Sequence, residues 1–188
     1  LTIEYRNDVV APPSESGLYD FGTTEWEDVE AAVQFALDNG ANKIVLVGYS
    51  MGGGIVVSYQ LKSELADRTV GMVLDAPMLN FGRTVDKGAQ ERSVPAPVTF
   101  MAKLFSTIRF GVDWGALDFL AHAGELSVPI LLIHSDIDDT VPIETSIEFA
   151  GAAPDIVEFH TFSDVGHVAS WNSYPDEYES LFREFVER

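Results

Sequence analysis

The sequence lacks several features that define large classes of proteins. It has no cysteine, which excludes disulfide bonds and thiolate metal sites and leaves the redox compartment open. It has no apolar run near the roughly 20 residues that a membrane-spanning helix needs. Basic residues are scarce, because 11 Lys and Arg stand against 30 Asp and Glu, and the formal net charge is −19. A surface of this charge repels nucleic acid and anionic membranes, so we expect no nucleic-acid partner.

The length and composition of the chain are those of one folded domain. The 188 residues, 46% of them hydrophobic, are enough to bury a substantial core. Short, β-branched apolar runs alternate with stretches in which apolar residues recur at helical spacing. We therefore predict an α/β fold over residues 1–188, with a mostly parallel sheet and helices on both faces. The predicted strands are residues 44–47, 70–74, 129–134 and 156–162, and Leu1–Tyr5 alternates like the end of another strand.

Helices and loops follow from the same patterns. The predicted helices are residues 24–39, 51–66, 98–108, 114–125, 142–151 and a last one from 175. A capping box of Thr24 and Glu27 is expected to open the first of them. Glycine, proline and charged residues punctuate residues 81–96, which predicts a loop there.

The chain is organised around residues 43–61, which read KIVLVGYSMGGGIVVSYQL. A buried strand runs into Ser50, and a helix rich in small residues follows. A serine at such a turn is held in a strained conformation with its Oγ exposed above the sheet edge, and Gly48 and Gly52 avoid collisions between strand and helix. The amide of Met51, at the helix N-terminus, points toward negative charge developing on a substrate carbonyl oxygen.

A serine nucleophile needs a base and an acid that orients this base. In a parallel sheet both must come from loops at the carboxyl ends of strands. The loop after the third predicted strand, HSDIDDTVP, holds Asp136, Asp138 and Asp139, and the loop after the fourth holds His167. The chain order is therefore serine, acid, histidine.

These motifs resemble those of the alpha/beta-hydrolase superfamily, in its esterase, lipase and serine-aminopeptidase-like branch. The turn around Ser50 resembles the superfamily's nucleophile elbow. The stretch after His134 resembles the pattern H-G-x-x-D-x-x-V-P, with Asp138 at the aspartate and Ser135 in place of the glycine. His167 follows Gly166, as the family histidine usually follows a glycine. The resemblance implies a catalytic triad of Ser50, Asp138 and His167.

Other residues compete for these roles. Asp75 ends the second predicted strand, where some alpha/beta hydrolases carry their acid, but its neighbours Pro77 and Met78 fit the rim of a site better. His122 and His160 are interpreted as structural, and His134 as a brace for the Asp138 loop. The acid cluster could suggest calcium, but it lacks the spacing and the terminal glutamate of a calcium loop.

The aromatic-rich segment between the second and third predicted strands lies where the family inserts a lid. We expect a helical cap at about residues 81–121, although ordinary helix packing is the alternative. The cap could supply an acyl-chain pocket. The candidate lining residues are Met78, Phe100, Leu104, Phe105 and Trp114.

The resemblance also implies that parts of the superfamily fold are missing. The sequence looks like the C-terminal two-thirds of a longer hydrolase, because TIEYRND resembles the end of the family's fourth strand. The second oxyanion donor is then expected upstream of Leu1. The strand at 44–47 would be an unpaired apolar edge, and this chain alone would be unstable and nearly inactive.

The resemblance implies a serine hydrolase that cleaves a carboxylic ester or related acyl compound. Peptide hydrolysis of the serine-aminopeptidase kind and a non-catalytic binding module remain alternatives, whereas the serine of the elbow disfavours a haloalkane dehalogenase. We expect a small-molecule acyl substrate and neither cofactor nor metal. The sequence does not reveal the oligomeric state. The lack of a signal-like segment carries no information on localisation, because we expect the true N-terminus upstream of Leu1, and the cytoplasm is favoured only by default.

Overall fold

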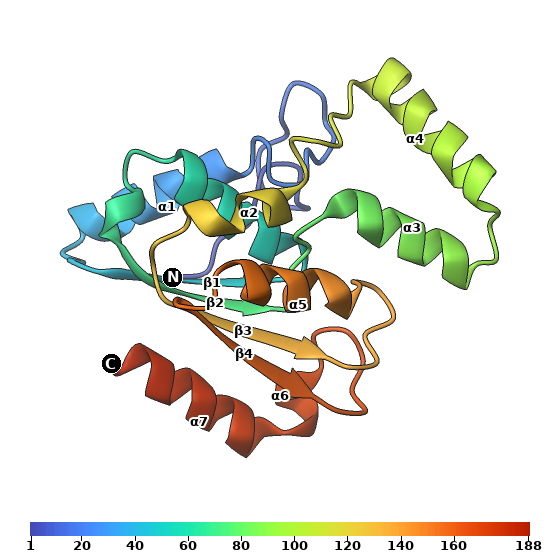
Figure 1. Ribbon diagram of the computed structural model, residues 1–188. Helices are drawn as coiled ribbons and strands as arrows, with labels where there is room; N and C mark the ends of the chain where they lie inside the picture. Colours follow the sequence, from blue (N-terminus) through green and yellow to red (C-terminus); the bar gives the residue numbers. More distant parts are fainter.

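A parallel sheet forms the centre of the computed structural model, which describes residues 1–188 (Figure 1). Its strands are β1 (Ile44–Tyr49), β2 (Thr69–Asp75), β3 (Ile130–Ser135) and β4 (Val157–Phe162). They lie side by side in chain order, and every neighbouring pair is parallel. All four carboxyl ends therefore meet at one edge of the sheet, where the predicted site residues belong.

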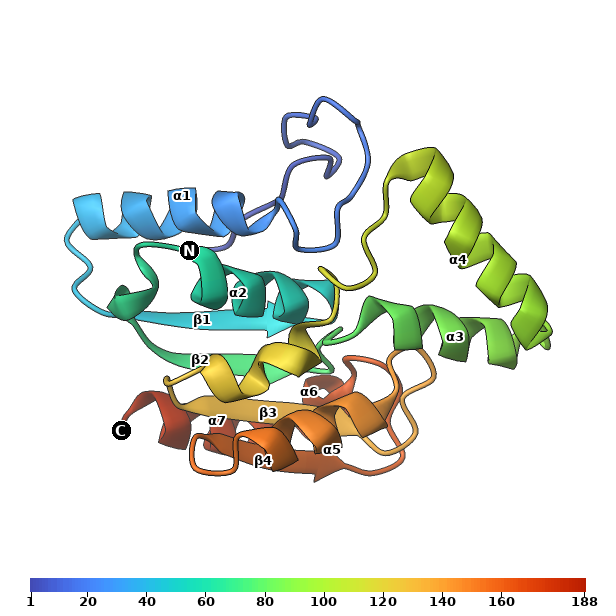
Figure 2. The ribbon, with the colours of Figure 1, turned by 45° about the horizontal axis from the view of Figure 1, so that its top comes forward.

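Helices cover both faces of this sheet, as predicted (Figure 2). They are α1 (Trp26–Asp38), α2 (Met51–Lys62), α3 (Phe81–Glu91), α4 (Ala96–Phe110), α5 (Ile143–Ala152), α6 (Ser170–Ser173) and α7 (Pro175–Val186), with short 3₁₀ helices η1 (Ala66–Arg68) and η2 (Phe119–Glu125). No helix of the structure combines the length and the apolar character needed to cross a membrane.

The buried core is divided between the two faces by the alternation of strand side chains. Met72 and Leu74 of β2 face the larger cluster, which α1, α2, η2 and α5 complete. Val73, between them, faces the smaller cluster under α7, with Tyr178 and Phe185. The strands read as continuous apolar runs because both of their faces are buried.

Several local predictions were wrong. Residues 81–91 form α3 instead of a loop, because the Asn80 side chain accepts a hydrogen bond from the Arg83 amide at 2.9 Å and caps the helix. Leu1–Tyr5 is not a strand, and of residues 114–125 only 119–125 are helical, as 3₁₀ helix.

The predicted capping box is also absent. Thr24 donates instead to the Asp20 carboxylate at 3.0 Å, and the carboxylate of the fully buried Glu25 accepts the amides of Asp20 and Gly22. A side chain next to the predicted cap therefore organises this turn.

The strand β1 is an edge strand that pairs only with β2. Its outer residues Val47 and Tyr49 are 37% and 47% exposed, so the predicted apolar edge is present in this structure. At the carboxyl ends of the strands, α3 and α4 extend beyond the body of the protein (Figures 1 and 2).

The helix α2 approaches the end of β2 so closely that glycine is required. A Cβ on Gly53 would lie 2.4 Å from the Pro77 Cβ, and one on Gly48 would lie 2.6 Å from the Gly52 carbonyl oxygen. Gly52 was expected to be as restricted, but a Cβ there would meet only the Tyr5 hydroxyl, at 3.1 Å. The closest contact of the helix start is therefore made by Gly53, and not by Gly52 as the sequence suggested.

Gly53→Ala should destabilise the protein, because the new methyl group displaces Pro77 and the backbone next to it. We expect a loss of about 1–3 kcal/mol in the free energy of unfolding, measured by urea denaturation. Gly151→Ala is the matched control, since nothing lies within 4 Å of a Cβ on this residue of α5. That change should stabilise the helix by about 0.5–1 kcal/mol. Equal effects of the two substitutions would contradict the close approach.

Candidate active site

Ser50 occupies a strained turn between β1 and α2. Its φ of 51° and ψ of −120° lie in a region that side chains other than glycine rarely adopt. Three backbone hydrogen bonds hold it there: its amide donates to Asp75 at 2.9 Å, and its carbonyl accepts from Met78 at 2.8 Å and from Gly53 at 3.0 Å. The turn is therefore fixed on both sides by the end of β2 and the start of α2.

The structure brings the three predicted triad residues into one line of hydrogen bonds. His167 Nε2 lies 2.8 Å from Ser50 Oγ, and His167 Nδ1 lies 2.7 Å from Asp138 Oδ2. An ionised carboxylate only accepts hydrogen bonds, so Nδ1 carries the ring proton. Nε2 is then the free base that accepts the hydrogen of the Ser50 hydroxyl.

Asp138 is buried, yet it is stabilised in its ionised form. Burial alone would raise its pKa, but hydrogen bonds from His134, His167 and the amides of Thr140 and Val141 outweigh burial and hold the pKa of Asp138 well below its ordinary value. Both amides donate to Oδ1, at 2.8 and 2.9 Å, which leaves Oδ2 for the histidines. The carboxylate can therefore orient the His167 ring at neutral pH.

His134 braces this acid, as predicted. Its Nε2 lies 3.2 Å from Asp138 Oδ2 and 3.3 Å from the Val141 carbonyl oxygen, and its Nδ1 lies 2.7 Å from Ser146 Oγ. Because both neighbours of Nε2 are acceptors, Nε2 carries the hydrogen and Nδ1 accepts from Ser146. The side chains of His134 and Asp138 are fully buried, so this contact locks the acid loop onto α5.

Two contacts that sequence reasoning missed tie the acid loop to the histidine loop. The Ser135 hydroxyl donates to the Val165 carbonyl, and Asp136 Oδ1 accepts the Asp164 amide at 3.0 Å. Ser135, which departs from the family pattern, therefore has a structural role: it holds the backbone of Val165, two residues before His167. The departure itself was the only signal of it in the sequence.

The remaining candidates of the sequence lie elsewhere or bind locally. His122 pairs with Glu125 at 2.7 Å, His160 with Glu158 at 3.2 Å, and Asp139 with the Thr140 hydroxyl at 3.0 Å. No group of three or more His, Asp and Glu side chains is arranged to hold a metal ion.

A cavity of about 840 Å³ contains Ser50 and Met51 and follows the exposed side of β1 toward Leu1. Met51 is the first residue of α2, so its amide has no partner within the helix and is free for a substrate oxygen. The Tyr5 hydroxyl, which the sequence did not single out, reaches the start of α2 beside Gly52 in the same cavity.

None of the five residues predicted to line an acyl pocket belongs to this cavity. Phe100, Leu104 and Phe105 are exposed on α4, and Met78 is buried. Trp114 stacks on Phe81, with ring centroids 5.5 Å apart, at the base of the two projecting helices. A contact between these residues and an acyl chain stays a prediction.

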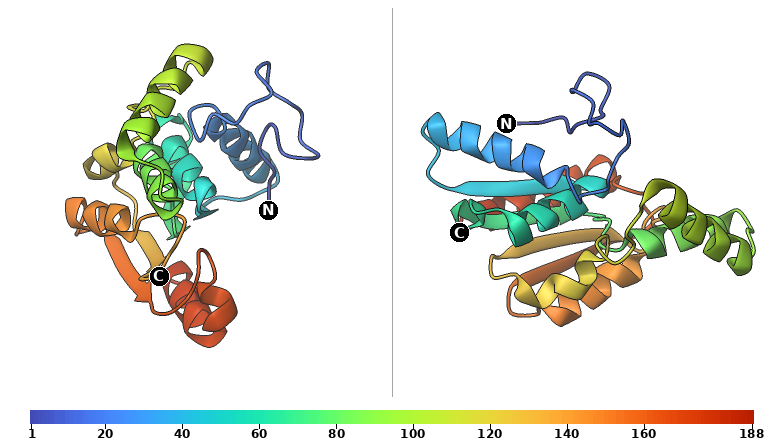
Figure 3. Two further views of the ribbon diagram at one scale, coloured as in Figure 1. Left: turned by 90° about the vertical axis from the view of Figure 1, so that its right-hand side faces the viewer. Right: turned by 90° about the horizontal axis from the view of Figure 1, so that it is seen from above.

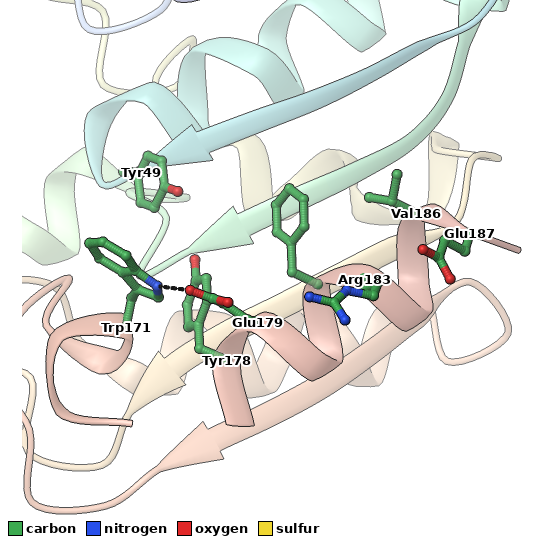
Figure 4. Close-up of a pocket in the computed structure, with 8 residues that line it drawn as sticks. Tyr49, Trp171, Tyr178, Glu179, Arg183, Val186 and Glu187 are labelled. Atoms are coloured by element: carbon green, nitrogen blue, oxygen red, sulfur yellow. Dashed lines mark hydrogen bonds between the residues drawn. The ribbon is translucent and has the colours of Figure 1, made fainter. Parts of the chain in front are cut away.

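Asp75, the competing acid, is not a partner of His167, whose ring nitrogens face Ser50 and Asp138. It is buried, its Oδ2 accepts from the Tyr178 hydroxyl at 3.0 Å, and its Oδ1 has no partner. Tyr178, on α7, also lines a hollow of about 500 Å³ together with Tyr49 and Trp171 (Figure 4). Burial, only partly offset by the bond from Tyr178, raises the pKa of Asp75 to about 6.

The pKa of Asp75 predicts a pH dependence of stability. Between the ordinary aspartate pKa of about 4 and the folded-state value of about 6, the folded protein binds more protons than the unfolded chain. The free energy of unfolding therefore falls as pH rises through this window. Asp75→Asn should remove this fall and leave the variant more stable than wild type above pH 6, by up to about 3 kcal/mol. Urea denaturation between pH 4 and pH 8 measures the difference.

Tyr178→Phe is the companion variant for this test. It removes a bond that favours the ionised carboxylate, so the fall in stability should extend to higher pH. Parallel curves for wild type and Asp75→Asn over the whole range would contradict the raised pKa.

The chain is similar in sequence to known serine hydrolases. The family described as serine aminopeptidase, S33, matches residues 19–116, a stretch that contains β1, the Ser50 turn, α2 and β2. Lysophosphatidylserine lipase ABHD12 of Macaca fascicularis is 24% identical over 211 residues, which cover 99% of this chain and 48% of the relative. The chain thus spans about half the length of this curated relative.

Solved structures of hydrolases share the fold. The esterase Pf2001 of Pyrococcus furiosus superposes with a TM-score of 0.70 at 22% identity, over 94% of this chain and 65% of the esterase. The acylaminoacyl peptidase of Pyrococcus horikoshii gives 0.67 at 19% identity, over 89% of this chain and 28% of the peptidase. The parallel sheet, these likenesses and a family match over more than half of the chain identify the protein as an α/β hydrolase that belongs to the serine aminopeptidase S33 family.

Proposed function

We propose that the protein is a serine hydrolase that cleaves a carboxylic ester or related acyl compound through an acyl-enzyme intermediate. The observation that carries this proposal is the unbroken line of hydrogen bonds from Ser50 through His167 to Asp138. A nucleophile, a base and an orienting acid in this arrangement are what acyl transfer requires. The strained turn supports the proposal further, because it holds Oγ away from the rest of the backbone.

Each residue has a defined part in the proposed reaction. Ser50 Oγ attacks the acyl carbon while its proton passes to His167 Nε2, and the Met51 amide donates to the oxyanion. The imidazolium, which Asp138 stabilises, gives that proton to the leaving oxygen as the bond to it breaks. Water then attacks the acyl-enzyme, with His167 as base, and releases the acid and free Ser50. Every proton moves between the reactants and groups of this chain.

The substrate class divides the proposal into two candidates. The similar lipase and esterase favour an ester, whereas the family's description and the similar acylaminoacyl peptidase favour a peptide bond. We favour the ester, because the similar lipase and esterase match 99% and 94% of this chain. We also propose residues 81–121 as the cap of the site. Turnover of p-nitrophenyl acyl esters compared with aminoacyl p-nitroanilides separates the two candidates.

Ser50 should react covalently with a fluorophosphonate probe, because its hydroxyl is hydrogen-bonded to a free base. Mass spectrometry of peptides from the labelled protein should locate the adduct on Ser50. Ser50→Ala should abolish labelling, whereas Ser173→Ala, in the short helix α6, should label like wild type. Labelling that persists in Ser50→Ala would overturn the nucleophile assignment, and an unlabelled wild type would favour a binding module.

Asp138→Asn should lower kcat for ester hydrolysis by on the order of 10⁴, by analogy with the serine-protease triad, because an amide no longer fixes the His167 tautomer. Asp75→Asn is the matched control, since it changes the other buried aspartate at the same sheet edge without touching the ring. Its kcat should stay within about tenfold of wild type, a barrier change of about 1.4 kcal/mol. The reverse ranking of the two variants would transfer the acid role to Asp75.

A further inference from the structure

The helix α4 has its apolar face outward. Thr99, Lys103 and Ser106, spaced to share one face, are its least exposed residues, and Lys103 Nζ binds the Gly82 carbonyl at 2.7 Å and the Asp86 carboxylate at 2.7 Å, both on α3. The opposite face carries the large apolar side chains. They are Val98, Phe100, Met101, Leu104, Phe105 and Ile108, exposed by 44% to 76%. A helix of a globular protein normally orients these faces the other way.

Nothing in the structure covers this apolar face. The views agree that α4 lies at the periphery, with α3 beside it and the sheet further away (Figures 1 and 3). We call residues 81–110, from the start of α3 to the end of α4, the α3–α4 arm. Six large apolar side chains on one outward face exceed the scattered apolar exposure of an ordinary surface and mark a docking surface.

The charge of the α3–α4 arm is opposite to that of the rest of the protein. The arm holds five of the 11 basic residues and two of the 30 acidic ones, so its formal charge is +3, whereas the other residues together carry −22. Three of its cations, Lys87, Arg92 and Arg109, have no carboxylate within salt-bridge distance. Arg109 is exposed at the edge of the apolar face, next to Phe110. The net charge of the chain conceals this local reversal.

We propose that the α3–α4 arm docks the protein onto the surface of an anionic lipid bilayer. An outward row of Phe, Met, Leu and Ile with Arg109 at its edge, on an arm of net positive charge, resembles the composition of helices that lie in a bilayer interface. The negative surface potential of an anionic leaflet attracts the arm's cations, while the −22 of the body is repelled and stays in water. Pairing between the arms of two copies would instead bring two charges of +3 together.

This docking is independent of the proposed hydrolysis, but its geometry suits it. The arm projects from the carboxyl ends of the strands, the same end of the sheet at which Ser50 lies (Figure 2). A protein docked by the arm therefore presents this end of the sheet to the bilayer. An acyl lipid could then reach the site without crossing the acidic face of the body.

Vesicle flotation of the complete chain tests the proposal. Vesicles of phosphatidylcholine with about one third phosphatidylserine should carry the protein upward, vesicles of phosphatidylcholine alone should carry much less, and added salt should release it. Arg92→Gln together with Arg109→Gln should weaken partitioning about thirtyfold. Met101→Ser together with Ile108→Ser should abolish flotation. All four residues are exposed, so the variants should retain the circular dichroism spectrum of wild type.

Matched controls lie at the other end of the sheet. Lys43→Gln removes an exposed cation just before β1, and Phe35→Ser removes an exposed aromatic side chain of α1. Both should float like wild type. Equal flotation with the two lipid compositions, or equal losses in arm and control variants, would overturn the proposal. A dimer in size-exclusion chromatography that Met101→Ser with Ile108→Ser converts to monomer, without flotation of wild type, would assign the face to a second copy instead.

Discussion

The candidate site depends on the close approach between α2 and the end of β2. Because Gly53 has no side chain, its backbone lies against Pro77, and the next residue, Met78, donates its amide to the Ser50 carbonyl. The Ser50 amide is bound in turn by the Asp75 carbonyl. A serine with φ of 51° persists only where the surroundings determine its conformation this fully. The glycines after Ser50 therefore stabilise the geometry that gives Oγ its exposure.

The candidate site also requires that His167, which follows β4, lie beside Ser50, which follows β1. Neighbouring strands lie about 4.8 Å apart, so the loop after β4 must bring His167 back across about 14 Å to Ser50 beyond β1. A free loop would pay for this order in conformational entropy. Here Ser135 and Asp136 bind the backbone of the loop, and Asp138 binds the ring itself. The loop after β3 thus supplies the acid and also supports the base, which explains why so many of its side chains are polar and bound.

The fold, and the meeting of the three candidate side chains at one edge of the sheet, were predictable because their signals are local and periodic. Each strand was a short apolar run, and Ser50, Asp138 and His167 each followed such a run at a turn. The features that were not predicted depend on individual side-chain contacts. Helix α3 contains two glycines and depends on the Asn80 cap, and Glu25 replaces the expected capping box by reaching back along the chain. The pairing of Asp75 with Tyr178 spans 103 residues, and no spacing rule encodes such a contact.

The α3–α4 arm shows that the net charge of a chain does not predict which of its surfaces can bind a membrane. A net charge of −19 predicted repulsion from anionic membranes, and for the body of the protein that argument holds. Electrostatic attraction, however, falls off within about 10 Å at moderate salt, so a surface responds to the charges nearest to it. An arm of +3 that projects from the body meets a membrane before the acidic residues do. The distant negative charge then limits how the protein can lie, and it favours contact through the arm over contact through any other face.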